Sequence, residues 1–298
     1  MDITVELKAF VATAMTGSFT AAADQLGISN RLTSKYVAEL EQRLGVRLLQ
    51  RTTRKVGLTP AGEELLLRAP AVLDELDDLL SDVSEDSRGL SGVIRVSAPV
   101  TFGESYVGGM LGRFAAANPG LTIDLRLNDS FVDLASDGID VAFRIGQSDM
   151  LSVKSRKLGE MRTMAAASPG YLAQAGNLQS PAELADHACI LDTNRRQPRR
   201  WVFMKDGAPV VTEVQGRFSV NSARAAVDLA VSDLGVCYAP RFALSEALAS
   251  GALVPVLAGF DGVSADIAAV YLEGRTLPRK VRALIDFAVA DIKTTAVL

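Results

Sequence analysis

Apolar positions recur at helical spacing between residues 4 and 44, and glycines at 17, 27 and 45 interrupt the pattern. This spacing predicts three short helices, one over about 4–15, one containing 21–26 and one over about 31–44. Two short apolar runs then flank a basic turn at 52–55, which predicts a hairpin. Three helices followed by a basic hairpin are typical of a winged helix-turn-helix, which we place at 1–58. The alternative is a small helical bundle with a solvated run of charges.

A long helix is predicted next, because Thr59 is a good cap, Pro60 suits a first helical position and the amphipathic pattern continues to about residue 85. Its apolar positions alternate in steps of four and three, which indicates a heptad seam for dimerisation across 59–88. Pro70 removes one backbone hydrogen bond and should kink this helix or perturb the seam there. The alternative is that the stripe packs on its own domain. The seam consists of Leu65, Ala69, Val72, Leu76, Leu79 and Val83.

The pattern changes after the Ser/Gly-rich break at 87–92. Buried-strand patterns at 93–99, 121–128 and 139–146 alternate with helical patterns at 104–117 and 130–137, which indicates a parallel sheet with helical crossovers. A second α/β set follows, with helices predicted over 222–232 and 241–250 and a last amphipathic helix near the C-terminus. Two α/β lobes of this kind would bind a ligand at the carboxyl ends of their strands.

The distribution of charge matters more here than its sum. The net charge of the chain is −4. Residues 1–60 carry eight Lys/Arg and five Asp/Glu (+3), whereas residues 61–88 carry two and nine (−7). A local basic face is what phosphate binding requires, so the acidic total does not argue against DNA.

The segment 21–36, AAADQLGISNRLTSKY, carries the strongest chemical signal. Gly27 allows the left-handed turn between two helices, and Ser29 or Asn30 caps the second. Small polar and cationic side chains at a helix N-terminus can contact phosphates and base edges. This segment is therefore the predicted DNA-reading element.

Catalysis finds little support in the sequence. The single histidine, His187, has no clustered carboxylates or cysteines, and with Cys189 alone it cannot close a metal site. No nucleotide-binding, nucleophile-elbow or metalloprotease motif occurs, so we expect no enzyme, cofactor or metal. Cys189 and Cys237 are expected to be core thiols. The first residues lack the features of a signal peptide and no apolar run could cross a bilayer, so we expect a cytoplasmic protein rather than an exported solute-binding protein.

The stretches GSFTAAADQLGIS, LGVRLLQRTTRKVGLTPAG and the βαβ run ending DGIDVAFRIG together resemble the LysR-type transcriptional regulators of bacteria. The resemblance covers essentially the whole chain, and ASPGYLAQAG, LADHACI and LPRKVRALIDF extend it. It implies a winged helix-turn-helix, a dimerising linker helix and a two-lobed α/β effector domain like periplasmic binding proteins, at 89–298. It also implies a homodimer or homotetramer that binds double-stranded promoter DNA and responds to a small-molecule effector, such as a carboxylate or an aromatic compound.

Domain and DNA-site positions follow from that resemblance. It implies lobe I at 93–166 and 267–298, and lobe II at 167–266, with chain crossings near 167/168 and 265/266. Members commonly have Gln, then Pro or Ser, Ala and an aliphatic residue where this chain has Asn30, Arg31, Leu32 and Thr33. Arg31 could either make a bidentate contact to guanine or bind only phosphate. The implied DNA-binding residues are Ser29, Asn30, Arg31, Thr33, Ser34, Lys35, Arg51, Arg54 and Lys55.

The resemblance also points to an effector site between the lobes, at Pro99, Val100, Thr101, Phe102, Asp129, Arg144, Trp201, Asn221 and Ser222. Thr101 is the best hydroxyl donor of this set. Asn221 and Ser222 are good helix caps, beside which backbone N–H groups can receive an anion. Arg144 lies between apolar residues and needs a partner, which is either a ligand carboxylate or an acid of its own lobe.

Overall fold

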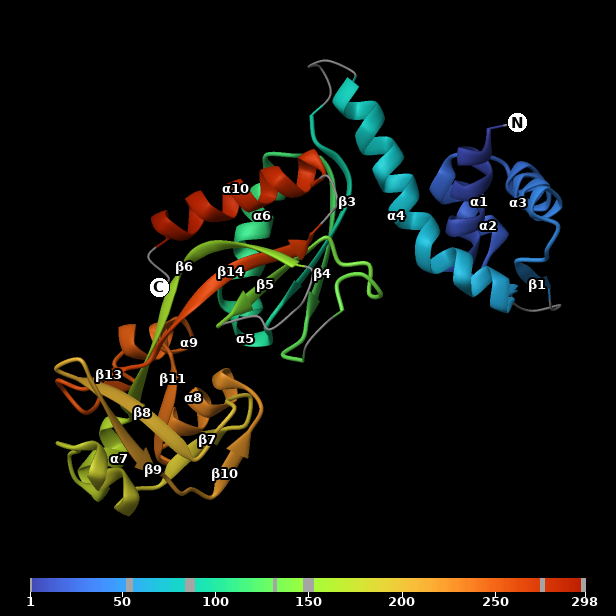
Figure 1. The fold of residues 1–298 in the computed structure, drawn as a ribbon. Helices are drawn as coiled ribbons and strands as arrows, with labels where there is room; N and C mark the ends of the chain where they lie inside the picture. The colour runs from blue at the N-terminus through green and yellow to red at the C-terminus, as the bar shows by residue number, and fades with distance from the viewer. Residues whose placement is uncertain are drawn as a thin grey trace. The chain divides into compact units, whose positions relative to one another are not determined.

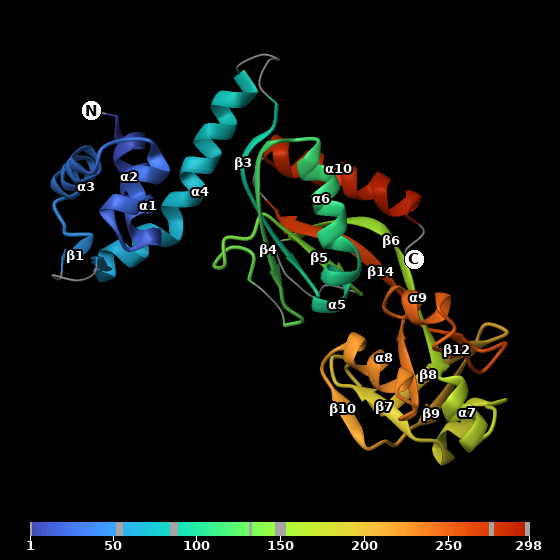
Figure 2. The same cartoon turned by 180° about the vertical axis from the view of Figure 1, so that it is seen from behind.

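The computed structural model describes residues 2–51, 56–83, 89–130, 133–146, 153–273 and 277–295. The chain divides into two compact units, Met1–Gly92 and Val93–Leu298, each with its own core. Figure 1 shows the ribbon in chain order, and Figure 2 shows it from behind. Each unit is described by itself below.

The first unit contains the predicted helix-turn-helix and hairpin. Its helices are α1 (Ile3–Thr16), α2 (Phe19–Leu26) and α3 (Asn30–Leu44), followed by the antiparallel strands β1 (Leu49–Arg51) and β2 (Val56–Leu58) and by α4 (Pro60–Val83). Ser18 and Ser29 are the N-caps of α2 and α3. Gly27 ends α2 in the left-handed conformation, at a φ of 65°, which allows the tight turn into α3. The predicted order of elements is confirmed.

The first half of α4 packs on the core of its own unit, which corrects part of the predicted heptad seam. Ala69 is 3% exposed in the single chain, and Leu65 packs against the cluster around Phe10 and Leu40. This half of the stripe is covered without a second copy. Val72 and Leu79 remain more than half exposed. The side chain of Val83 lies outside the described residues.

The second unit is built on a large mixed sheet. Within the described residues nine strands form it, in the order β10-β7-β11-β6-β14-β5-β3-β4 with β12 paired to β6. These strands are β3 (Ser91–Ala98), β4 (Gly120–Leu127), β5 (Val141–Ile145), β6 (Val153–Ala167), β7 (Cys189–Asp192), β10 (Phe218–Val220), β11 (Val236–Pro240), β12 (Val254–Pro255) and β14 (Ser264–Leu272). The pairs β3–β5, β10–β7 and β11–β7 are parallel, as the α/β pattern predicts.

Helices and a small second sheet complete this unit. The helices are α5 (Val100–Phe102), α6 (Gly108–Ala116), α7 (Pro169–Ala175), α8 (Ala223–Val231), α9 (Arg241–Ala249) and α10 (Arg279–Thr294), with a π-helical segment at Gly103–Val107 between α5 and α6 and a 3₁₀ segment at Pro181–Asp186. The small sheet has the order β13-β8-β9, from β13 (Asp261–Gly262), β8 (Arg200–Lys205) and β9 (Ala208–Glu213). In Figures 1 and 2, α6 and α10 accompany one end of the large sheet, and α7, α8 and α9 accompany the other.

Two long strands, β6 and β14, run from one lobe into the other and pair antiparallel along their length (Figure 1). Residues 153–162 of β6 pair with β14, whereas residues 163–167 pair with β11 and β12 of lobe II instead. Ala165 and Ala167 both belong to the core cluster of lobe II. The first crossing therefore lies within β6, a few residues before the predicted 167/168.

The segment between β4 and β5 differs from the helix predicted at 130–137. Its described part is a turn over residues 134–138 that ends at Gly138, whose φ is +63°. The carboxylate of Asp133 accepts a hydrogen bond from the backbone N–H of Ala135 at 3.0 Å. A capping aspartate and a left-handed glycine five residues apart leave room for a turn but not for a helix.

Candidate functional site

The first turns of α3 present an exposed polar and basic surface. Arg31 and Lys35 are both exposed, one helical turn apart, and Ser34 is half-buried between them. Lys35 lies 3.8 Å from Glu39, whereas the Arg31 guanidinium makes no hydrogen bond or ion pair within the described part of the chain. This leaves the Arg31 guanidinium available to a phosphate or a base edge.

Three other predicted DNA-binding residues of this helix have structural roles. The Ser29 hydroxyl accepts a hydrogen bond from the backbone N–H of Leu32, and the Asn30 amide donates one to Thr20 on α2 at 3.0 Å. Thr33 is fully buried and its hydroxyl donates to the backbone oxygen of Ser29. Thr33 is therefore corrected from a predicted DNA-binding residue to a core residue.

Two glutamates that the sequence pattern does not single out position α3. Glu6 on α1 is fully buried and accepts two hydrogen bonds from Arg43, each at 3.0 Å. Glu41 accepts hydrogen bonds from the backbone N–H groups of Leu48 and Leu49 at 2.8 and 3.1 Å. Glu41 thus ties α3 to the first strand of the hairpin. The hairpin residues Arg54 and Lys55, and the side chain of Arg51, lie outside the described residues.

In lobe I, one of the predicted effector residues after β3 bonds the carboxylate of another, Asp129. Pro99 precedes the first turn of α5, where the Val100 backbone N–H donates to Asp129 at 3.0 Å. Thr101 is 7% exposed, and its hydroxyl has no hydrogen-bond partner among the described residues. A hydroxyl without a protein partner, on an otherwise largely buried residue, is well suited to receive a polar group of a ligand.

Arg144 at the end of β5 does not pair with an acid of its own lobe in the part of the chain that the structure describes. Its guanidinium donates to the Phe143 backbone oxygen at 3.0 Å and to the Ser97 hydroxyl at 3.3 Å. Burial lowers the pKa of Arg144, and the charge of Asp129 acts in the opposite direction. The hydrogen-bond partners of this partly buried guanidinium among the described residues are neutral, which leaves it able to bind a ligand carboxylate, with Asp129 as the nearby acid of its own lobe.

Asn194, from the loop after β7, connects Asp129 to lobe II. Its amide donates to Asp129 Oδ2 at 3.0 Å and to the backbone oxygen of Asn221 at 2.7 Å. Ser222 caps α8 through its hydroxyl, which accepts from the N–H of Ala225. The predicted residues Asn221 and Ser222 are thus brought to the same junction. We call Ser97, Thr101, Asp129, Arg144, Asn194 and Asn221 the lobe junction.

Asp192, beside the lobe junction, is a second residue, with Asn194, that the sequence prediction of the site misses. It is 9% exposed and accepts a hydrogen bond from the backbone N–H of Asn194 at 3.0 Å. Burial raises its pKa, and the nearby charge of Asp129 acts in the same direction. The sequence Asp-Thr-Asn at the end of a buried strand could have predicted both residues. An aspartate in such a turn commonly accepts a hydrogen bond from the backbone N–H two residues ahead.

Two predicted effector residues are core residues instead. Phe102 is fully buried and stacks against Phe242 of α9, with ring centroids 5.2 Å apart. Trp201 is 1% exposed, packs on Tyr238 and donates its indole N–H to the Pro198 backbone oxygen. Neither ring has surface left for a ligand, so both leave the candidate site.

The described residues offer no cluster of three metal-ligating side chains. His187 contacts the Tyr171 hydroxyl at 3.1 Å. None of the described helices combines the length and the apolar character that crossing a membrane requires. Both cysteines are free and buried, as the sequence predicts.

Comparison with known families identifies both units. Residues 5–63 match the model of the bacterial regulatory helix-turn-helix protein, lysR family, and residues 87–293 match the LysR substrate binding domain. The chain belongs to the LysR family of transcriptional regulators. A LysR regulator joins a DNA-binding domain to an effector-binding domain. The exposed first turns of α3 belong to the first of these domains and the lobe junction belongs to the second.

Relatives of this LysR protein match nearly its whole length. An uncharacterized HTH-type transcriptional regulator of Haemophilus influenzae is 36% identical over 281 residues, which are 94% of this chain and 98% of that protein. The HTH-type transcriptional regulator PtxR of Pseudomonas aeruginosa is 36% identical over 280 residues, 94% of this chain and 90% of PtxR. The structure of CrgA, a LysR-type regulator of Neisseria meningitidis, has 29% identity and a TM-score of 0.63 over 97% of this chain and 98% of CrgA.

These matches confirm the two-part fold and the function of the chain as a DNA-binding LysR-type transcriptional regulator with an effector-binding domain. A structure of OxyR from Corynebacterium glutamicum, 22% identical, shares the fold with a TM-score of 0.69 over 99% of this chain and 94% of OxyR. The named relatives are transcriptional regulators, and none is named as an enzyme.

Proposed function

We propose that Arg31, Ser34 and Lys35 read promoter DNA in the major groove. The observation that carries this proposal is the unpaired, exposed guanidinium of Arg31 in the first turn of α3, beside exposed Lys35 in the described part of the helix. A guanidinium can bind guanine O6 and N7 together, whereas a lysine ammonium suits a phosphate. Arg51, Arg54 and Lys55 of the hairpin would add contacts to the phosphate backbone of the DNA.

A gel shift with the upstream regions of its own and neighbouring genes tests this proposal. Because phosphate contacts release bound counterions, the affinity for the preferred fragment should fall steeply between low and physiological salt. A fragment of shuffled sequence is the control. Equal affinity for both fragments, or binding that does not respond to salt, would contradict specific reading by α3.

The proposed effector is a small organic carboxylate bound at the lobe junction. Arg144 would receive the carboxylate, because its guanidinium is partly buried and has only neutral hydrogen-bond partners among the described residues. Thr101 is largely buried as a residue and supplies a hydroxyl that forms no hydrogen bond with any described residue. Ligands at the carboxyl ends of strands in α/β folds occupy comparable positions.

A thermal-shift screen of small carboxylates, with the corresponding amides as uncharged controls, identifies the effector class. Binding to the folded state alone raises the melting temperature in a concentration-dependent way. Arg144→Gln should remove the response to the carboxylate, and Thr101→Ala should weaken it. Amides that stabilise as well as acids would rule out the proposed role of Arg144.

We also infer that α4 pairs with α4 of a second copy in a homodimer, which can assemble further into a homotetramer. The side chains of Val72, Leu79 and Leu80 are 55%, 59% and 60% exposed in the single chain. Burying this apolar stripe against a second copy of α4 would remove it from water. Leu79→Glu should reduce the oligomer in light-scattering chromatography, whereas Arg68→Glu on the same helix should leave its mass unchanged. Unchanged mass for Leu79→Glu would place the interface elsewhere.

A further inference from the structure

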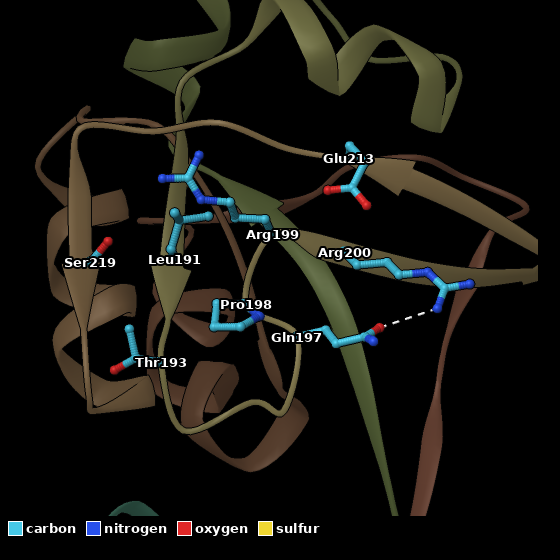
Figure 3. A pocket seen from close by; sticks show the side chains of 8 residues that line it. All are labelled: Leu191, Thr193, Gln197, Pro198, Arg199, Arg200, Glu213 and Ser219. Atoms are coloured by element: carbon cyan, nitrogen blue, oxygen red, sulfur yellow. Dashed lines mark hydrogen bonds between the residues drawn. The ribbon is translucent and has the colours of Figure 1, made fainter.

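Lobe II contains a pocket of about 370 Å³ that is separate from the lobe junction (Figure 3). Its apolar surface comes from Leu191 at the end of β7 and from Pro198 in the following loop. Leu191 itself is 2% exposed, so it forms part of the packed core beneath the opening. The volume falls within the usual range for small-molecule sites, roughly 300–1,000 Å³.

Two guanidinium groups border the pocket. Arg199 and Arg200 both line it, and neither lies within 4 Å of a carboxylate in the described part of the chain. Among those residues the Arg200 side chain bonds only Gln197, at 3.2 Å, and the Arg199 side chain bonds none. Figure 3 shows that the side chains of Arg199 and Arg200 extend in opposite directions, Arg199 past Leu191 and Arg200 toward Gln197. Glu213 is the cross-strand partner of Arg200 in the β8–β9 pair, so Arg199 is the guanidinium that an entering anion would meet without a nearby described ion-pair partner.

Two hydroxyl groups and one carboxylate also line the pocket and limit the kind of ligand that it can bind. Thr193 and Ser219 carry hydroxyls on the side of the pocket away from Arg200, and the Ser219 hydroxyl makes no hydrogen bond among the described residues. Glu213 lines the opposite side and would repel a second negative charge. Two cations, one carboxylate and an apolar floor together suit a monoanion with an apolar body.

We propose that this pocket is a second effector site, which binds a small organic monocarboxylate with an aromatic or aliphatic body. The carboxylate would lie against Arg199, with Ser219 as a further donor, and the body would lie on Pro198 above the buried Leu191. The lobe junction and this pocket share no lining residue, so each can be tested without the other.

Ligand binding at this site can be followed by the fluorescence of Trp201, which lies next to the pocket. Trp201 is the only tryptophan in the sequence, and its buried indole donates to the backbone oxygen of Pro198 at 3.1 Å. Pro198 lines the pocket and Arg200 precedes Trp201 in sequence. A ligand that displaces either residue changes the surroundings of the indole, so intrinsic fluorescence should follow binding.

The test is a titration of the full-length protein with benzoate and hexanoate, followed by tryptophan emission. We expect a saturable change with both acids, and none with benzamide or with inorganic phosphate at equal ionic strength. Arg199→Gln should raise the half-saturating concentration at least roughly tenfold, since it removes a charge-assisted hydrogen bond. The matched control, Arg217→Gln, removes an exposed arginine of lobe II that does not line the pocket and should leave the titration unchanged.

Further variants keep the proposal falsifiable if Arg199→Gln lowers the amount of folded protein. Ser219→Asp adds a carboxylate at an exposed lining position and should abolish the emission change. Thr101→Ala at the lobe junction should not affect it. No saturable change with either acid, an equal response to phosphate, an unchanged titration in Arg199→Gln, or a response lost in Thr101→Ala would each overturn the proposal.

Discussion

The side-chain amide of Asn194 bridges Asp129 of lobe I and the backbone oxygen of Asn221 in lobe II, at 3.0 and 2.7 Å. Both amide hydrogens are therefore used at the lobe junction. Asp129 in turn accepts from the Val100 N–H at the start of α5. One small side chain thus connects a loop of lobe II to the segment of lobe I that carries Thr101.

Asn194→Asp should weaken this connection, because it removes the donor and brings a second carboxylate to Asp129. We expect faster hydrogen exchange at Val100 and a larger radius of gyration in small-angle scattering. Asn177→Asp, which makes the same change at an exposed position of lobe II, is the control. Identical scattering and exchange for the two variants would mean that Asn194 does not hold the lobes together.

Arg31→Ala and Lys35→Ala should each reduce promoter affinity roughly tenfold or more, without changing the oligomer. If Arg31 reads a guanine, its variant should also lose sequence preference, whereas loss of a phosphate contact at Lys35 should lower the salt dependence instead. Footprinting and salt titrations separate these outcomes. Arg68→Ala removes a cation from α4 of the same unit and should bind DNA normally.

Glu41→Ala should destabilise the first unit by about 2–4 kcal/mol, because the buried N–H groups of Leu48 and Leu49 both lose their acceptor. Glu41→Gln keeps one carbonyl oxygen and should be less destabilising. Chemical denaturation of the two variants measures the difference. Because Glu41 ties α3 to the hairpin, promoter affinity should fall with stability in both. Equal stability of Glu41→Ala and the wild type would refute this role.

Neither cysteine should react with a thiol reagent in the folded protein. Burial raises the pKa of Cys189 and of Cys237 to about 12 each, so the thiolate is scarce at neutral pH. Their strand partners are Val236 and Ile190, which directs the two thiols to opposite faces of the sheet and excludes a disulfide between them. An Ala173→Cys variant, exposed on α7, should react at once as the control. Rapid labelling of the wild type would contradict this prediction.

Lobe I should lose stability below about pH 4 through Asp291. This carboxylate accepts from Arg113 and from the Tyr106 hydroxyl, which lower its pKa from the ordinary 3.8. A lowered folded-state pKa stabilises the fold above the ordinary value, and that contribution disappears as the pH falls through it. The melting temperature of Asp291→Asn should therefore lie below that of the wild type at neutral pH and approach it in acid. The proposed role of Asp291 would be excluded if the difference in melting temperature between Asp291→Asn and the wild type did not change with pH. It would also be excluded if the exposed Asp286→Asn gave the same pH-dependent difference.

Elements that depend on local signals could be predicted from the sequence. Gly17, Gly27 and Gly45 end their helices in the left-handed conformation, as expected from the interruptions they make in the apolar pattern. The parallel pairing of β3 with β5 follows from the α/β alternation. The helix predicted at 130–137 is wrong, because the Asp133 cap and the left-handed Gly138 outweigh the apolar spacing on which that prediction depends.

Side-chain roles that depend on distant partners could not be predicted from the sequence. Thr33 and Arg31 are two residues apart on a polar helix start, and only the packing of α3 on α1 decides which of them is buried. Trp201 stacks on Tyr238, which lies far along the chain, and this contact makes it a core residue. Likewise, the bridge from Asn194 to Asp129 joins residues of different lobes, so no spacing rule reveals it.

The two lobes are connected by β6 and β14, which are paired with each other. We therefore expect a motion between the lobes to twist these two strands together. Since β6 and β14 are hydrogen-bonded to each other from Ser264 to Leu272, neither can swing or slide independently of its neighbour. Their register shifts between Ile267 and Ala268, and such bulges increase local twist and bend. A ligand at the lobe junction would therefore act on a single torsional coordinate, and the stiffness of this bulged ribbon would set how far the lobes rotate for a given binding free energy.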